Sequence, residues 1–337
     1  MKVVQMIVSH GQGGLEKHFA DLCNGLSRKG HEVHAIFPRL GQFDLDPDVQ
    51  RHPFDFKGGR YNPWQAIRLF RLLRSIDPLI IHTHAGKASA CMHWIRPFIR
   101  AKTVATVHGL KSTTAPYMAS DAIIAVSQKA LSMLPENDKT TIVYNGIQVA
   151  ASSSSVSLGA RFNNDWPIAL SVGRLVTVKG FDLLIPAVKG LELNLVIIGD
   201  GPEKVQLEQQ VSEHELWDQV ALLGSVENAA KLIPQSDLCV VSSRREGFSY
   251  FFAEALMSRV PVVSTLVNDS ESLLEESNLV RETSVKAIHK SLQSYLDSPE
   301  IFRAGCEKAF NWAEKSLTVD AMVESNEAVL CRVLSED

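Results

Sequence analysis

Several features that would assign a protein to a special class are missing from this chain of 337 residues. No apolar run approaches the roughly 20 residues that a membrane-spanning helix needs, and the apolar opening, 1–9, is too short for a secretion signal. The five cysteines are scattered and form no C-x-x-C pair, which argues against a disulfide framework or zinc ribbon and favours a reducing cytoplasm. A net charge of −4 suggests no nucleic-acid partner.

Apolar runs alternate with amphipathic stretches, which is the pattern of βα units with parallel sheets. In the first half, strands are predicted at 3–8, 32–37, 79–82, 103–107, 122–126 and 143–147. In the second half, they are predicted at 168–172, 195–198, 220–223, 238–241 and 260–264. The fold class is therefore α/β, with two doubly wound Rossmann-like domains facing a central cleft.

The domain boundaries follow from the same pattern. We expect a first domain at 1–148 and a linker at 149–165, where Ala, Ser and Asn dominate without periodicity. A second domain is expected at 166–315, and helices from 286 onward. Since ligands bind beyond the carboxyl ends of such strands, the loops after each strand should carry the functional residues.

The first such loop holds Gly13 and Gly14, between the first strand and a helix predicted at 15–28. Glycines there let the backbone approach a ligand, and a helix N-terminus attracts anions. The dinucleotide-binding fingerprint would need a third glycine where Glu16 stands, and an acid where Pro38 and Arg39 end the second strand. A nicotinamide or flavin enzyme is therefore disfavoured, and we expect no cofactor.

Charged residues gather after two strands of the second half. Arg174 and Lys179 share the loop after 168–172, where two cations can clamp a diphosphate. Glu246 and Glu254 follow the strand at 238–241, and on one continuous helix they would lie about 12 Å apart. At that separation, they can hold two ends of an elongated ligand. A helix opening at Gly247 would direct its N–H groups at phosphates.

Taken together, these motifs resemble the retaining glycosyltransferases of family 4, which have the two-Rossmann-domain (GT-B) fold and include bacterial lipopolysaccharide-core and mannosyl-lipid transferases. The resemblance runs from about residue 1 to about residue 334. The motifs that carry it are Gly13-Gly14-x-Glu16, Gly173-Arg174, Lys179-Gly180, Gly199-Asp200-Gly201-Pro202, Leu223-Gly224-Ser225-Val226 and Glu246-x7-Glu254.

The resemblance implies a role for each motif. Arg174 and Lys179, beside Gly173, would bind the donor diphosphate, and Glu254 the ribose. Glu246 with the N–H groups of Gly247 and Phe248, and His108, would contact the donor sugar. The base would lie beside Ser225 and Val226, and the Gly13-Gly14 loop would approach the phosphates from the first, acceptor-side domain. The last helix, within 316–337, would cross back onto that domain.

The implied reaction moves a hexose-type sugar from a nucleoside diphosphate donor, expected to be uridine-based, to a glycan or lipid-linked acceptor. It keeps the configuration at the transferred carbon and needs no metal, because cations neutralise the leaving diphosphate. The implied setting is synthesis of the bacterial cell envelope. Two alternatives stay open: a nucleotide-sugar epimerase of similar architecture, and a non-catalytic sugar-nucleotide-binding subunit.

The chain departs from the family pattern after the Glu246-x7-Glu254 motif. Arg259 stands where the family usually has glycine, and the usually glycine-rich loop reads Val267-Asn268-Asp269-Ser270-Glu271. Contacts of the 259–271 segment with the donor are therefore an open question.

Two further groups of residues raise other functions, a zinc site and a membrane contact. His10, His82, His84 and His108 all fall at predicted strand ends, but no acid or cysteine stands at ligand spacing beside them, and we expect no metal. The segment 60–111 carries nine cations and one acid, with arginines at 68, 71 and 74. It suits an anionic membrane surface or a phosphorylated acceptor, contacted through Arg68, Arg71, Arg74, Arg96 and Arg100. A solvated helix face is the alternative.

Overall fold

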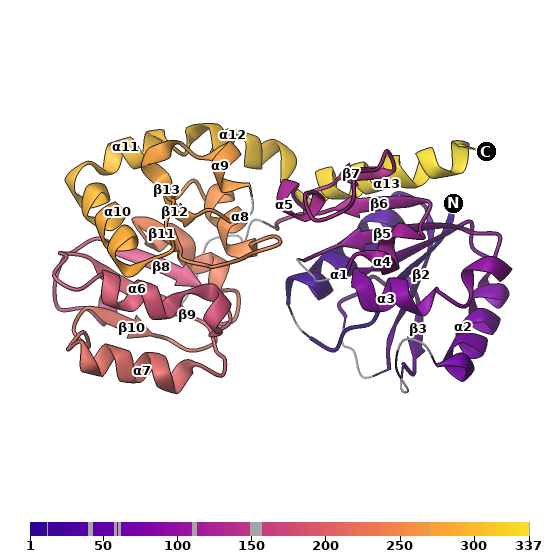
Figure 1. The fold of residues 1–337 in the computed structure, drawn as a ribbon, viewed down its shortest axis with the longest axis horizontal. Helices are drawn as coiled ribbons and strands as arrows, with labels where there is room; N and C mark the ends of the chain where they lie inside the picture. The colour runs from indigo at the N-terminus through magenta and orange to yellow at the C-terminus, as the bar shows by residue number, and fades with distance from the viewer. Residues whose placement is uncertain are drawn as a thin grey trace. The chain divides into compact units, whose positions relative to one another are not determined.

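The computed structural model describes residues 1–11, 13–39, 43–56, 59, 62–109, 113–148, 157–267 and 269–336. The chain forms two compact units, unit 1 at Met1–Gly146 with Thr318–Asp337, and unit 2 at Ile147–Leu317 (Figure 1). The first eight residues of the predicted linker, 149–156, lie outside the described residues. Each unit is an α/β body, and we describe each by itself.

Within the described residues, unit 1 has one seven-stranded sheet in the order β3-β2-β1-β4-β5-β6-β7, and every neighbouring pair is parallel. Its strands are β1 (Lys2–Ile7), β2 (Glu32–Pro38), β3 (Gln50–Phe54), β4 (Ile80–His84), β5 (Lys102–Val107), β6 (Ala122–Ala125) and β7 (Thr140–Ile142). Its helices are α1 (Gly14–Arg28), α2 (Pro63–Ile76), α3 (Ala85–Cys91), the 3-10 helix η1 (Arg96–Phe98), α4 (Ala115–Met118), α5 (Gln128–Leu131) and α13 (Val319–Ser335).

The described part of unit 2 has a six-stranded parallel sheet in the order β10-β9-β8-β11-β12-β13. Its strands are β8 (Ile168–Val172), β9 (Asn194–Ile198), β10 (Val220–Leu222), β11 (Leu238–Val241), β12 (Val262–Thr265) and β13 (Leu279–Val280). Its α-helices are α6 (Phe181–Ala187), α7 (Lys204–Glu213), α8 (Tyr250–Met257), α9 (Ser270–Leu273), α10 (Val285–Asp297), α11 (Pro299–Ala304) and α12 (Glu307–Ser316). Its 3-10 helices are η2 (Gly159–Arg161), η3 (Thr177–Lys179), η4 (Ala229–Gln235) and η5 (Glu276–Asn278).

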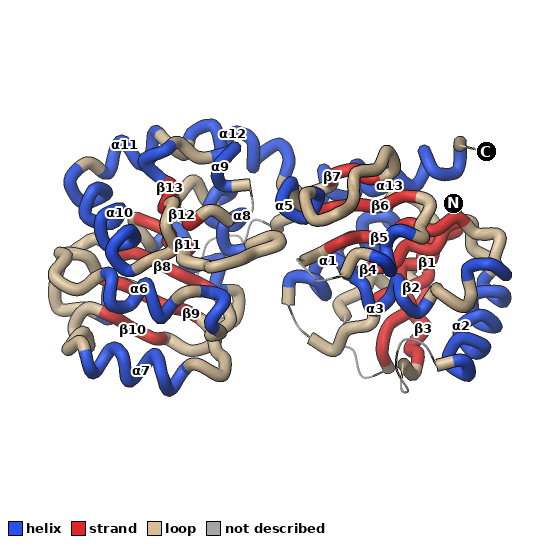
Figure 2. Tube along the Cα trace, in the orientation of Figure 1, coloured by secondary structure: helices blue, strands red, loops and turns tan. Residues whose placement is uncertain are grey.

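Helices cover both faces of each sheet, as the helices drawn around the red strands in Figure 2 show. In unit 1, α1 and α13 bury one face through side chains such as Phe19, Leu26 and Leu330. The other face packs against α2 and α3, through Leu69, Leu73 and Ala88. The last helix is held to α1 by an ion pair between Lys29 Nζ and Glu327 Oε2 at 2.7 Å. Chain segments from the two ends of the sequence thus complete one core.

The predicted fold class of two parallel Rossmann-like domains is confirmed, and three strand predictions need correction. The expected strand at 143–147 is wrong: the last strand of the first sheet ends at Ile142. The edge strands β3 and β13 were not predicted. The cleft between the two sheets stays a prediction. Among the described residues, no helix combines the length and the apolar character that a membrane span requires.

Candidate active site

The predicted site residues divide between the two units, and in each they lie at or near the carboxyl ends of strands. Gly173, Arg174 and Lys179 follow β8, and Glu246 follows β11. In unit 1, Gly13 and Gly14 follow β1, and His108 follows β5. Because parallel strands place all carboxyl ends at one edge, each unit gathers its own group of polar side chains.

Lys179 and Glu246 form the centre of the group in unit 2. The ammonium of Lys179 lies 2.5 Å from Oε1 of Glu246, and the Ser243 hydroxyl donates to the same oxygen at 2.8 Å. Both charged side chains are largely buried, at 22% and 10% exposed. They line a small hollow of about 10 Å³ together with Ser249. A cation and a carboxylate are therefore fixed side by side at the end of the sheet.

Close backbone packing explains the glycines of this loop. Gly180 has φ +70°, and a Cβ there would meet the Ser242 carbonyl oxygen at 2.1 Å. The Ser242 hydroxyl donates to the Lys179 carbonyl at 3.0 Å. Arg244 braces the same two loops, since its guanidinium makes two 2.6 Å hydrogen bonds to the Asp182 carboxylate. The loops after β8 and β11 thus hold one another, while the Arg174 side chain is exposed.

The helix near the two glutamates begins later than the sequence suggested. Helix α8 starts at Tyr250, and its N-cap Ser249 accepts a hydrogen bond from Phe252 N at 3.3 Å. Gly247 does not open the helix, and Glu246 stands before it. The estimate of about 12 Å between the two carboxylates on one continuous helix is therefore wrong. Glu254 lies on α8 and is half-buried.

The remaining predicted contacts of unit 2 lie beyond β9 and β10. Gly199 has φ +150°, and its N–H donates to the Gly224 carbonyl at 2.8 Å, which joins the two loops. Ser225 and Val226 follow directly, with Ser225 exposed and Val226 half-buried. Ser225 and Val226 therefore lie on the loop after β10, which is hydrogen-bonded to the loop after the neighbouring strand β9.

In unit 1, the glycine loop is closed by its own glutamate. The Gly13 N–H donates to Glu16 Oε2 at 2.8 Å, and the Ser9 hydroxyl hydrogen-bonds to Oε1 of the same side chain. Glu16 is buried. The sequence suggested that the start of this helix offers its N–H groups to an anion. In the structure, the Gly13 N–H is already bonded to the Glu16 carboxylate.

Histidines converge at the carboxyl ends of β4 and β5. His84 Nδ1 lies 3.2 Å from His108 Nε2, and His18, from α1, stacks edge-on against His108 with ring centroids 4.5 Å apart. Of the four histidines considered from the sequence, His10 is exposed and His82 instead bonds the Thr106 hydroxyl at 2.6 Å. His18 was missed, because its position inside a helix gave no sign that it faces the strand ends.

Burial keeps His18, His82 and His84 neutral. It lowers the pKa of His18 to about 4, an effect that the nearby Asn145 side chain partly opposes. It lowers the pKa of His82 to about 3, with a smaller contribution from the charge of His18. The pKa of His84 lies well below its usual value, first through burial and then through its three histidine neighbours. Neutral imidazoles can accept a proton or a metal ion through a lone pair.

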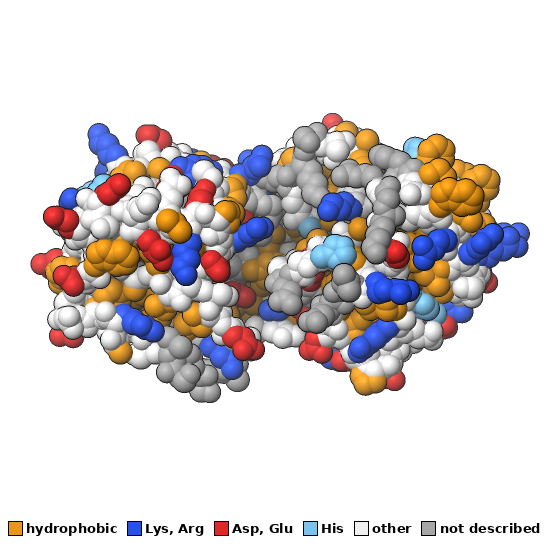
Figure 3. Space-filling view, turned by 90° about the horizontal axis from the view of Figure 1, so that it is seen from below, with side chains coloured by type: hydrophobic (Ala, Val, Ile, Leu, Met, Phe, Trp, Pro, Cys, Tyr) orange, Lys and Arg blue, Asp and Glu red, His pale blue; other side chains and the backbone are white. Residues whose placement is uncertain are grey.

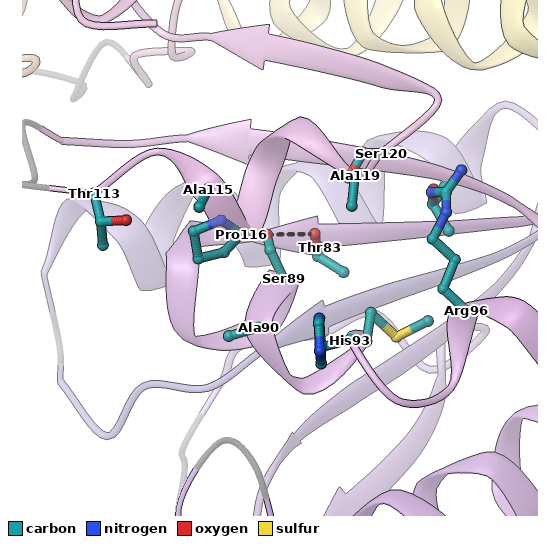
Figure 4. Close-up of a pocket in the computed structure, with 12 residues that line it drawn as sticks. Thr83, Ser89, Ala90, His93, Arg96, Thr113, Ala115, Pro116, Ala119 and Ser120 are labelled. Atoms are coloured by element: carbon teal, nitrogen blue, oxygen red, sulfur yellow. Dashed lines mark hydrogen bonds between the residues drawn. The ribbon is translucent and has the colours of Figure 1, made fainter.

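A cavity of about 390 Å³ lies in unit 1 between β4, α3 and α4. Figure 4 shows Thr83 and Ser89 joined by a hydrogen bond in its wall, at 2.8 Å. Arg96 also lines it, and pairs with Asp121 at 2.8 Å. The hydroxyls and the guanidinium give the cavity several polar groups in a mainly apolar wall, which is the usual make-up of a small-molecule site.

The outer face of α2 is both apolar and basic. Trp64 is 77% exposed and Phe98, from η1, is 74% exposed. An apolar groove of about 320 Å³ runs between α2 and η1. Arg68, Arg71, Arg74 and Arg100 are exposed, whereas Arg96 is half-buried in its pair with Asp121 and leaves this group. Figure 3 shows hydrophobic side chains gathered beside Lys or Arg side chains on the α2 side of unit 1.

The departure at Arg259 has a structural explanation. Helix α8 ends in a Schellman motif, in which Val260 N donates to Ala255 O at 3.2 Å and Arg259 N to Leu256 O at 3.0 Å. Arg259 therefore adopts the left-handed conformation, with φ 53°, that glycine usually fills. Its guanidinium bonds Glu307 at 2.6 Å and Glu314 at 2.9 Å on α12. The side chain faces α12, and Asn268 lies outside the described residues.

Family comparison defines the class of this protein. The family model described as "Glycosyl transferases group 1" matches residues 159–315, and "Glycosyltransferase Family 4" matches residues 12–151. Between them, the two models match the chain from residue 12 to 315 except 152–158. The chain belongs to the family 4 glycosyltransferases of the GT-B fold, and it is an enzyme that transfers a sugar.

Individual relatives agree with this assignment. The chain is 24% identical to the N-acetyl-alpha-D-glucosaminyl L-malate synthase of Bacillus anthracis, over 94% of this chain and 93% of that one. It is 25% identical to LpsD of Rhizobium meliloti, a lipopolysaccharide core biosynthesis glycosyltransferase, over 70% of each chain. The confirmed predictions are thus the family, the fold and the enzyme class.

Solved structures show the same fold at low sequence identity. A sucrose-phosphate synthase from Thermosynechococcus elongatus superposes with a TM-score of 0.85 at 16% identity, over the whole of both chains. Anabaena HepE in complex with UDP-glucose superposes with a TM-score of 0.76 at 16% identity, also over the whole of both chains. The site residues themselves are not tested by these similarities, and their roles stay predictions.

Proposed function

We propose that this enzyme transfers a hexose from a UDP-sugar to a glycan or lipid-linked acceptor in synthesis of the bacterial cell envelope, with retention of configuration. The observation that carries the proposal is the Lys179–Glu246 pair at the end of β8, with Arg174 in the same loop. A cation there stabilises the leaving diphosphate, where negative charge develops. HepE in complex with UDP-glucose supports a uridine donor, and the relative LpsD supports an envelope acceptor.

Each predicted contact has a chemical role in this proposal. Glu246 accepts from sugar hydroxyls through Oε2, since Lys179 and Ser243 both donate to Oε1. The N–H groups of Gly247 and Phe248, and His108 from unit 1, contact the same sugar. Glu254 accepts from the ribose diol. Gly173 lets the Lys179 stem lie against the strand end, because a Cβ there would meet Lys179 Cε at 3.3 Å.

The acceptor side belongs to unit 1 in this proposal. The cavity beside Thr83 and Ser89 has the size of a site for a small polar group, and Gly13 and Gly14 approach the donor phosphates. No side chain acts as a nucleophile. The leaving phosphate takes the proton of the acceptor hydroxyl, so that the new bond forms on the face that the diphosphate leaves.

The direct test is a transfer assay with UDP-hexoses and a panel of envelope-type acceptors, followed by NMR of the product. We expect an α-linked product from an α-linked donor, and turnover that survives excess chelator, because the diphosphate is neutralised by cations. A β-linked product would contradict retention. Release of an epimer without any acceptor would point to an epimerase, and loss of activity on chelation with rescue by Mn²⁺ would contradict metal independence.

We also propose that the outer face of α2 binds an anionic membrane on the cytoplasmic side. The exposed Trp64 and Phe98 can enter the interface, and Arg68, Arg71 and Arg74 can meet lipid phosphates. A cytoplasmic location fits the five free cysteines. A lipid-linked acceptor would then lie in the membrane to which the enzyme is bound.

Charge reversal tests this surface. Replacing Arg68, Arg71 and Arg74 by Glu should release the protein from phosphatidylglycerol vesicles, because each cation near such a surface contributes about 1 kcal/mol. The matched control reverses Lys189, Lys286 and Lys315, which are exposed in unit 2, and should sediment like wild type. Equal co-sedimentation of both variants would contradict the proposal, and so would a wild type that never sediments with vesicles.

A further inference from the structure

Three histidines from separate elements of unit 1 point at one another. His18 comes from α1, His84 ends β4 and His108 follows β5, and one ring nitrogen from each lies within 4.8 Å of the other two. His18 and His84 are 1% exposed, while His108 is half-buried. The cluster is therefore closed on the side of the core and reachable at His108.

The hydrogen bonds of His84 set the direction of its lone pair. Its Nε2 lies 2.7 Å from the side-chain oxygen of Gln5, to which it must donate. A neutral imidazole then keeps a lone pair on Nδ1, which accepts a hydrogen bond from His108 Nε2–H at 3.2 Å. A metal ion takes the place of that proton once His108 carries its proton on Nδ1 instead. Two imidazole nitrogens on a tetrahedral zinc ion lie about 3.3 Å apart, given Zn–N bonds of about 2.0–2.1 Å. A second group that orients a histidine ligand in this way is usual at metal sites.

His18 provides an independent sign of a ligand. Both of its ring nitrogens are buried, and the Asn145 side chain is close enough to engage one of them, which leaves the other without a hydrogen-bond partner among the described residues. A buried polar group without a partner is destabilising by about 1–3 kcal/mol. A metal ion at the centre of the cluster would give the His18 lone pair a partner after a small inward movement of the side chain.

We propose that His18, His84 and His108 bind one zinc-like divalent ion and that this ion inhibits sugar transfer. Three neutral imidazoles suit zinc and its neighbours in the first transition row, and do not suit Mg²⁺ or Ca²⁺, which prefer oxygen ligands. The fourth position, beside the half-buried His108, stays open to water. The inhibition rests on the proposed function, because the ion would occupy the His108 imidazole that is assigned to the donor sugar. The metal binding itself does not rest on the proposed function.

The experiment titrates Zn²⁺ into the chelator-treated full chain, with isothermal calorimetry and thermal unfolding as readouts. We expect one ion per chain, and a rise in melting temperature on addition of Zn²⁺. His108→Gln and His18→Asn should each weaken binding at least about tenfold. Gln5→Leu, which removes no ligand, should weaken it by about 10- to 100-fold, because His84 loses the partner that orients it.

The matched control is His52→Gln. His52 also belongs to a histidine pair, with its Nε2 3.0 Å from His34 Nδ1, but His34 uses its other nitrogen on Glu32. This variant should bind Zn²⁺ as wild type does. Melting temperatures without metal show whether each variant folds. If His18→Asn does not fold, His108→Gln decides the test, because His108 is half-buried and its replacement disturbs the core less.

Three results would overturn the site: no stoichiometric binding by wild type, undiminished binding by His108→Gln, or loss of binding in His52→Gln alone. The inhibition has its own outcome. Zn²⁺ at saturation should stop transfer, and chelator should restore it. Transfer that continues with zinc bound would overturn the inhibition, while the calorimetric site would stand. A chain that transfers no sugar under any condition would count against the proposed function, and the titration would still decide the metal site.

Discussion

The two sheets carry opposite chemistry at the carboxyl ends of their strands. At the carboxyl ends of β4 and β5, unit 1 buries neutral histidines, whose pKa values burial holds far below their usual range. At the ends of β8 and β11, unit 2 presents the charged pair Lys179 and Glu246, braced by the neighbouring ion pair between Arg244 and Asp182. The same topology therefore holds a charged pair at the strand ends of one unit and neutral polar groups at those of the other. Function here is decided by loop residues, not by the fold.

The largest effect should come from removing the cation of unit 2. Lys179→Met keeps the apolar stem and deletes the ammonium that we propose to face the leaving diphosphate, so kcat should fall by about 100- to 1,000-fold. Transfer kinetics with the UDP-sugar donor measure this. Lys189→Met, at an exposed position of the same unit, should change kcat little. Glu246 loses its ion-pair partner in this variant, so the fold itself could be weakened. Thermal unfolding of Lys179→Met, and of the double variant Lys179→Met with Glu246→Gln, shows whether a lower kcat reflects lost stability or lost catalysis. A kcat near that of wild type would remove Lys179 from the reaction.

Glu254 should have the next largest effect. Glu254→Gln keeps a hydrogen-bond acceptor but loses the proposed charge-assisted bond to the ribose, at a cost of about 1.5–3 kcal/mol. The dissociation constant for UDP should therefore rise by roughly 10- to 150-fold, which calorimetry measures. Glu213→Gln, at an exposed position on α7, is the control. Unchanged UDP affinity in Glu254→Gln would place the ribose elsewhere.

Much of the fold could be predicted because the buried parallel strands are continuous apolar runs. Ile168–Val172 and Leu238–Val241 match their predictions in full. The strand β3 reads Gln-Arg-His-Pro-Phe at the sheet edge, mostly exposed, and has no apolar run to reveal it. The strand β13 has two residues, too few for any pattern.

The site was partly predictable for a different reason. Loops after strands carry glycines and charged residues, and the spacing of these residues can be read from a sequence. The direction in which a side chain points from a helix cannot be read in this way. His18 sits in a regular amphipathic pattern, and only packing shows that it points at the ends of β4 and β5 rather than into an apolar core. The start of α8 was misplaced because the capping hydroxyl of Ser249 competes with Gly247 as a start signal.

Burial in unit 1 also disfavours the charged form of Asp21, and this effect can be tested. Burial raises the pKa of this carboxyl to about 6, although Lys17 and Arg28 oppose the shift. An acid whose native pKa is raised disfavours the folded state once it ionises, so stability is lost as pH rises from about 4 to about 6. Asp21→Asn is neutral throughout. It should match wild type near pH 4 and exceed it by about 1–2 kcal/mol at pH 7, after allowance for partial solvation.

Urea unfolding at both pH values measures the difference at Asp21. Asp48→Asn, which changes an exposed carboxyl of the same unit, should show no such pH dependence. A gain of equal size at pH 4 and pH 7 would show that the Asp21 carboxyl does not titrate between them.

The smallest effect should come from the departure at Arg259, where strain and attraction oppose each other. Arg259→Gly relieves a left-handed conformation worth about 1–2 kcal/mol but loses solvent-exposed ion pairs to Glu307 and Glu314, which are weak because water and salt screen them. It also loses a guanidinium 5.1 Å from the Phe310 ring centroid. The free energy of unfolding should therefore stay within about 1 kcal/mol of wild type. Arg259→Ala keeps the strain and loses the contacts, so it should be the less stable of the two variants.

Salt sharpens this last comparison. Ion pairs at the surface weaken at 1 M salt, where the Debye length is about 3 Å. The free energy of unfolding of Arg259→Gly should therefore rise relative to that of wild type at 1 M salt. Both variants should bind UDP as wild type does, because the Arg259 side chain faces α12 and not the carboxyl ends of β8 and β11. A change in UDP affinity that both variants share would show instead that the 259–271 segment shapes the donor site, and the charged site of unit 2 would then extend beyond Lys179 and Glu246.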